Sequence, residues 1–186
     1  STINGVTYAA QIIGFDHDIL TTADGSRTKA GITFQLVDCL KTTYSMNGSN
    51  TNVNGWRGST MRTSTMATLL SQLSSDLKSV LKFVNKVTSV GNNSSGLETT
   101  SDKLFLLSEI EVFGATQYSY AGEGKQYEYY TAGNSTIKKV NGSANYWWER
   151  SPYSGGTSYF CCVYINGSAS SGSASYSYGV SFGFCV

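Results

Sequence analysis

The C-terminal segment 145–186 constrains the fold most. It holds a single acid, Glu149, and a single base, Arg150, but six Tyr, ten Ser and six Gly. A Ser/Gly tract of this kind is often disordered. Here large apolar residues bracket the tract and would anchor it: Trp147, Trp148, Phe160, Val163, Val180, Phe182 and Phe184. We therefore expect a folded segment in which Trp147, Phe160, Val163, Phe182 and Phe184 are mostly buried. The two tryptophans are interpreted as core residues in preference to a platform for sugar stacking.

Short strands are predicted at both ends of the chain. Within residues 3–40, the apolar and β-branched runs 8–15 and 31–37 are predicted strands, and Asp24-Gly25 lies in the polar turn between them. Near the other end, Asn166-Gly167 predicts a hairpin after the apolar run 160–165. The last eight residues, 179–186, alternate as a final strand.

Helices and loops are predicted in the middle. We expect a loop over 45–58, a helix over 59–70, and a second helix from Ser74 as N-cap with the apolar stripe Leu77, Val80, Leu81 and Val84. A polar loop over 91–102 and a buried strand over 103–107 follow. Ser108 and Glu111 fit a capping box, and 122–132 reads as a polar helix or an ordered aromatic loop.

Length and charge limit the classes of function. The 186 residues fit one domain spanning 1–186, and 13 Lys+Arg against 12 Asp+Glu leave a net charge of +1. Without a basic excess, a nucleic-acid partner is not expected. No apolar run of 18 residues and no signal-peptide pattern is visible, so membrane insertion is not expected either.

Few titratable residues are available for chemistry. His17 is the only histidine, which excludes a multi-histidine metal site, and Asp16-His17-Asp18 is interpreted as a turn or a local ion pair. Glu109 and Glu111 are assigned to helix capping and a solvated face in preference to a catalytic carboxylate pair. Arg150 is expected to pair with a carboxylate. No catalytic residue and no metal ligand is assigned.

The four cysteines are interpreted as buried free thiols. Cys161 and Cys162 would point to opposite faces of a strand and should not bridge each other, because a vicinal disulfide needs a strained turn. A bridge between Cys39 and Cys185 stays an open alternative.

Between its apolar positions, segment 145–186 has the composition of a binding surface. Tyr supplies a large rigid contact area, whereas Ser and Gly supply small adaptable neighbours. An enzyme site needs convergent titratable groups, which this segment lacks.

Three motifs near the C-terminus, 146–152 (YWWERSP), 160–163 (FCCV) and 179–184 (GVSFGF), resemble the signature of a domain family common in gut Firmicutes and their phages. The upstream segments 12–18, 75–80 and 101–109 are similar as well. That family is similar to the C-type-lectin-fold group, which includes formylglycine-generating enzymes and the variable proteins of diversity-generating retroelements. With the order of the motifs, the resemblance implies an α+β domain of C-type lectin type, with helices early and an antiparallel β core late.

In such variable proteins, adenine-directed mutagenesis rewrites codons near the C-terminus, and Tyr, Ser, Thr and Ile are among the products. The positions of this kind between the scaffold residues are the candidate ligand-binding residues: Tyr153, Ser154, Thr157, Ser158, Tyr159, Tyr164, Ile165, Ser170, Ser171, Ser173, Tyr176 and Tyr178.

The resemblance implies a receptor-binding or adhesin domain without catalysis, on a phage tail or a bacterial surface, with a protein or glycan ligand. A homo-oligomer or a larger assembly stays open. One alternative is a purely structural tail or surface domain. A formylglycine-generating type of enzyme is another, although Cys161 and Cys162 depart from that family's cysteine pattern. A calcium-dependent sugar lectin lacks its sugar-site motifs here, while a structural calcium ion on backbone and Asn/Asp oxygens stays open.

Overall fold

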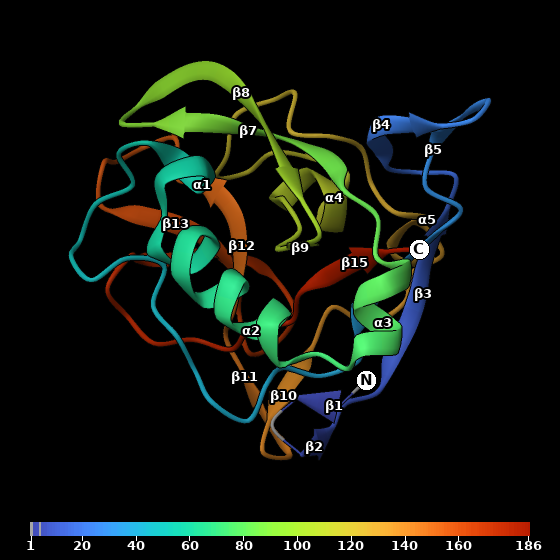
Figure 1. Ribbon diagram of the computed structural model, residues 1–186. Coiled ribbons are helices and arrows are strands. Elements are labelled where there is room, and N and C mark those ends of the chain that lie inside the picture. Colours follow the sequence, from blue (N-terminus) through green and yellow to red (C-terminus); the bar gives the residue numbers. More distant parts are fainter. Residues whose placement is uncertain (1, 4) are drawn as a thin grey trace.

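The computed structural model describes residues 2–3 and 5–186 as a mostly β protein, with 39% strand and 17% helix (Figure 1). A four-stranded antiparallel sheet joins the two ends of the chain, in the order β3 (Ala10–Phe15), β6 (Ile32–Leu36), β15 (Gly183–Cys185) and β9 (Leu104–Phe105). The C-terminal strand thus lies in the interior of this sheet, between strands from the first and the middle thirds of the sequence.

A second four-stranded sheet has the order β5 (Arg27–Lys29), β4 (Ile19–Asp24), β7 (Val84–Gly91) and β8 (Ser94–Asp102). A three-stranded sheet follows the order β12 (Trp147–Pro152), β13 (Tyr159–Val163) and β14 (Ala169–Ser173). Two small hairpins complete the strands: β1 (Thr2–Ile3) with β2 (Val6–Thr7), and β10 (Lys138–Val140) with β11 (Ser143–Asn145).

The helices are short and lie in the middle of the chain. They are α1 (Gly55–Gly58), the π-helical segment η1 (Met61–Met66), α2 (Ala67–Gln72), α3 (Ser75–Val80), α4 (Glu109–Phe113) and α5 (Glu128–Thr131). None of the described helices is long and apolar enough to cross a membrane.

The expected α+β fold of C-type lectin type, with early helices and a late β core, is therefore wrong. Strands form from the N-terminus onward, and the antiparallel sheets combine early, middle and late strands. The cause is long-range pairing: Phe184 of β15 lies opposite Phe34 of β6 and Leu104 of β9, a partnership that no local pattern encodes.

Several local expectations are confirmed. Ser108 caps α4 with a complete capping box, in which its hydroxyl accepts from the Glu111 amide and the Glu111 carboxylate accepts from the Ser108 amide. Ser74 caps α3, and Gly25 takes the positive φ of 62° that the turn between β4 and β5 requires. Trp147, Phe160, Val163, Phe182 and Phe184 are all buried.

Other local expectations are wrong. The helix from Ser74 ends at Val80, which is 49% exposed, and Val84 instead starts strand β7. The expected polar loop 91–102 is mostly strand β8, which pairs along β7 after a turn through Asn92 and Asn93. The alternating strand over 179–186 is reduced to β15, and residues on both of its faces are buried.

Candidate functional site

The β13–β14 hairpin carries half of the residues predicted to bind a ligand. Tyr159 lies opposite Ser173, and Cys162 lies opposite Ser170. Ser173 is buried and contributes no binding surface, which corrects its assignment. The most exposed predicted residues with large side chains are Tyr176 at 56%, Ile165 at 41% and Tyr159 at 40%. The other predicted residues are partly exposed, except Thr157, which is exposed.

Four tyrosines, Tyr146, Tyr164, Tyr176 and Tyr178, form one contiguous group, the tyrosine cluster. The ring of Tyr178 stacks on that of Tyr146 at a centroid distance of 4.7 Å, and Tyr164 meets Tyr146 edge-on at 4.7 Å. Tyr176 meets Tyr178 edge-on at 6.2 Å. Such pairs hold aromatic rings in fixed relative positions. The cluster therefore presents a preformed aromatic surface.

The cluster rests on the core through Trp148. The buried indole of Trp148 lies 4.5 Å from the ring of Tyr178, and its Nε1 donates to the carbonyl of Tyr44 at 2.7 Å. Tyr178 also covers Gly172 of β14, where a Cβ atom would collide with its ring. Tyr178 is thus an anchor between the core and the more exposed Tyr176.

The three-stranded sheet separates Tyr159 from this cluster. Trp148 pairs with Cys162 across β12 and β13, so the cluster lies on the Cys162 face. Tyr159 is three residues from Cys162, on the opposite face of the strand. There it meets Tyr153, which in turn contacts Tyr118, each pair at 6.0 Å. The predicted residues therefore form two groups instead of one surface.

Sequence reasoning missed two members of the surface, Tyr146 and the partly buried Tyr44. Tyr146 belongs to the motif 146–152 and was not among the candidate ligand-binding residues. Tyr44 joins Tyr178 through an isolated antiparallel bridge between segments far apart in the sequence. One signal could have placed Tyr146: it lies two residues before Trp148, and residues two apart along a strand lie on the same face.

Three of the stretches that contact the C-terminal region carry no charged residue. Asn50 accepts from the amide of Ser175, and Thr136 donates to the carbonyl of Gly167. Ser154 donates through its amide to the carbonyl of Tyr118. The stretches that hold these partners, 42–56, 112–122 and 132–137, have no Asp, Glu, Lys, Arg or His. Glu149 and Arg150 are buried, so neither they nor these three stretches add charge to the exposed surface of the C-terminal region.

The core contains a buried ion network, which the sequence did not predict as a whole. The ammonium of Lys86 donates to Asp18 and Glu111, both at 2.7 Å, and to the hydroxyl of Tyr127 at 3.1 Å. Arg150 pairs with Glu111, which confirms that it binds a carboxylate. Burial by itself raises the pKa of Asp18 and of Glu111, but the cations beside them hold both below their usual values. Asp18 lies in the bend between β3 and β4, as expected, but its ion pair is with the distant Lys86 and is buried. Glu111 is an ionised core residue, so its expected place on a solvated face is wrong.

A second buried group contains three more carboxyls. Glu109 accepts the amides of Tyr118 and Ser119, and Glu123 accepts the amide of Ser89 and the hydroxyl of Ser151. Glu109 is fully buried, so its expected place on a solvated face is wrong as well.

The third carboxyl, Glu149, is fully buried, and neither oxygen has a hydrogen-bond partner among the described residues. Burial, reinforced by Glu109 and Glu123, raises its pKa well above the usual value, and burial raises the pKa of Glu123 to about 7. Glu149 is therefore a neutral acid in the core.

All four cysteines are free and buried, as expected, and Cys161 and Cys162 are not bridged. Burial raises the pKa of both thiols, which disfavours the reactive thiolate form. Within the described residues, no three His, Cys, Asp or Glu side chains are placed to share a metal ion.

Comparison with known proteins shows the family of the chain but no function. A family model described as a domain of unknown function, DUF6273, matches residues 30–186, so the chain belongs to this family. No curated protein and no solved structure matches the chain.

Proposed function

We propose that this DUF6273 protein is a ligand-binding module that recognises its partner through the tyrosine cluster, without catalysis. The observation that carries the proposal is a preformed group of exposed and partly exposed aromatic rings next to stretches that carry no charged residue. Rigid tyrosines with small polar neighbours give contact area at a low cost in side-chain entropy. The face of β13 that holds Cys162 is the binding face in this proposal, and Tyr159 lies outside it.

Binding through tyrosine rings and small polar groups also predicts how the affinity depends on salt concentration. Recognition without ion pairs is insensitive to salt, because there is no Coulomb attraction to screen. We expect the affinity for the cognate partner to be unchanged between about 50 mM and 500 mM salt.

Two further parts of the proposal rest on the sequence resemblance. They are a place on a phage tail or a bacterial surface, and variation of the exposed positions by a retroelement. A near-copy template repeat and a reverse transcriptase gene beside the coding sequence would support the variation.

The test is a binding screen on a glycan array and on whole bacterial cells, followed by substitution. Tyr164→Ser and Tyr176→Ser should each weaken binding to any partner found, since aromatic anchors commonly carry about 2 kcal/mol or more at an interface. Tyr159→Ser, on the opposite face, is the matched control and should leave binding unchanged. Loss of binding in the Tyr159 variant alone would assign the site to the other face. Absence of any partner would favour the alternative of a purely structural domain.

A further inference from the structure

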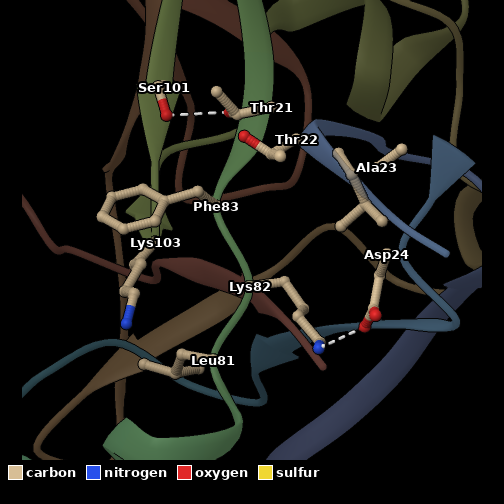
Figure 2. Close-up of a pocket in the computed structure, with 10 residues that line it drawn as sticks. Thr21, Thr22, Ala23, Asp24, Leu81, Lys82, Phe83, Ser101 and Lys103 are labelled. Carbon is tan, nitrogen blue, oxygen red and sulfur yellow. Dashed lines mark hydrogen bonds and ion pairs between the residues drawn. The ribbon is translucent and has the colours of Figure 1, made fainter.

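A second candidate site lies away from the tyrosine cluster, in a pocket of about 470 Å³. Its walls come from β4, from the connection between α3 and β7, and from the end of β8 (Figure 2). None of its lining residues belongs to segment 145–186. The pocket is therefore independent of the proposed binding surface.

The pocket exists because β4 leaves the sheet early. Leu20 pairs with Val84, and the amide of Thr21 donates to the carbonyl of Phe83 at 2.9 Å. Beyond Thr21, β4 makes no further pairing with β7 and continues only with β5 as its partner. The two strands start as neighbours and then diverge, which leaves a hollow between them. Phe83, which is 51% exposed, lies in the wall of this hollow.

The positive charge in the pocket exceeds the negative charge. Lys82 pairs with Asp24 at 2.8 Å, and both side chains are largely exposed, so this ion pair is weak and open to competition. Lys103 lies 5.0 Å from the ring centre of Phe83 and has no carboxylate within ion-pair distance among the described residues. With one carboxylate against two ammonium groups, the lining has a net charge of +1.

The polar groups of the pocket are segregated. Figure 2 shows the hydroxyls of Thr21, Thr22 and Ser101 at one end, and the ammonium groups of Lys82 and Lys103 at the other, with the Phe83 ring on one wall between them. Thr21 and Ser101 are held by a hydrogen bond of 2.8 Å between their hydroxyls. A complementary ligand has hydroxyls at one end, a carboxylate at the other and an apolar ring face between.

We propose that this pocket binds a carboxylated sugar, with the carboxylate on Lys103 and Lys82, the ring face on Phe83 and the sugar hydroxyls on Thr21, Thr22 and Ser101. A charge-assisted contact to an ammonium group is stronger than one between neutral groups, so the carboxylate supplies the selectivity. The hydroxyl end favours a sugar acid over an aromatic acid, because only the sugar has hydroxyls that can exchange hydrogen bonds with Thr21, Thr22 and Ser101.

The test is a chemical-shift titration of the isotopically labelled protein with sodium glucuronate, up to about 10 mM, where a Kd of 1 mM would approach saturation. Saturable shifts confined to 20–24, 81–83 and 101–103 are expected. Glucose, which lacks the carboxylate, and benzoate, which lacks the hydroxyls, should give much smaller shifts. No saturable shift in these segments would refute the site, and a preference for benzoate would refute the sugar.

Two substitutions should change the affinity for glucuronate in opposite directions. Lys103→Gln should weaken glucuronate binding about tenfold, while Asp24→Asn frees Lys82 and should strengthen it several-fold. The exposed Lys125, outside the pocket, gives the matched control Lys125→Gln, which should leave binding unchanged. Equal effects of Lys103→Gln and Lys125→Gln would mean that only the overall charge matters, and would overturn the proposal.

Discussion

Arg150 binds both carboxylate oxygens of Glu111 in the core, with Nη1 at 2.5 Å from Oε2 and Nη2 at 3.0 Å from Oε1. The same carboxylate caps helix α4 and accepts from Lys86 of β7. Glu111 therefore links α4, β7 and β12 at one point, and the ion network ties the three-stranded sheet to β7 and α4.

Removal of this arginine should be costly. Arg150→Met leaves Glu111 with one cation fewer in a fully buried site, and breaking a buried pair commonly costs about 3–5 kcal/mol. We expect a loss of this size in the free energy of unfolding, measured by denaturant titration. The control is Arg27→Met, which removes an exposed pair with Asp16 and should cost less than about 1 kcal/mol. Equal losses in the two variants would show that the buried pair has no special role.

Glu149 should make the protein less stable as the pH rises. Its pKa is raised in the folded state, so unfolding above its ordinary value of 4.5 releases a proton. The contribution of Glu149 to the free energy of unfolding is fully present below pH 4.5. It falls as the pH rises toward the pKa of the folded state, by about 1.4 kcal/mol per pH unit for one proton. Glu149→Gln removes this linkage, so its unfolding free energy should depend less steeply on pH between about pH 5 and pH 8. Parallel pH profiles for the two proteins would contradict a neutral Glu149.

The tyrosines of the candidate surface should differ in their effect on stability. Tyr176→Ser changes an exposed ring and should alter the free energy of unfolding by less than about 0.5 kcal/mol. Tyr178→Ser removes a ring that packs on Trp148 and stacks on Tyr146, and should cost about 2 kcal/mol or more. Thermal unfolding of the two single variants measures the difference. A similar melting temperature for both would mean that Tyr178 is not an anchor.

The cysteines should be unreactive until the protein unfolds. All four are buried, and burial raises the pKa of Cys39 to about 12, so the thiolate is scarce at neutral pH. A thiol reagent should modify none of the four in the native protein, and all four in denaturant without a reductant. Fewer than four reactive thiols after unfolding would reveal a disulfide, and rapid labelling of the native protein would reveal an exposed site.

The sequence by itself determined features that depend on residues a few positions apart. The capping box at Ser108, the N-cap at Ser74 and the turn at Gly25 form as predicted, because each is a contact within one turn of chain. The burial of Trp147 and Phe160 was equally predictable, because large apolar side chains leave water wherever a core exists to receive them.

Only the tertiary structure decided which distant segments meet. Residues 94–102 are polar, yet they form β8 because the backbone of β7 supplies their hydrogen-bond partners. Asp18, Lys86, Glu111 and Arg150 lie far apart in the sequence, and their charges are stable in the core only because folding brings them together. The candidate surface follows the same rule: strand alternation places Tyr159 on one face of β13 and the tyrosine cluster on the other, and composition alone could not separate them.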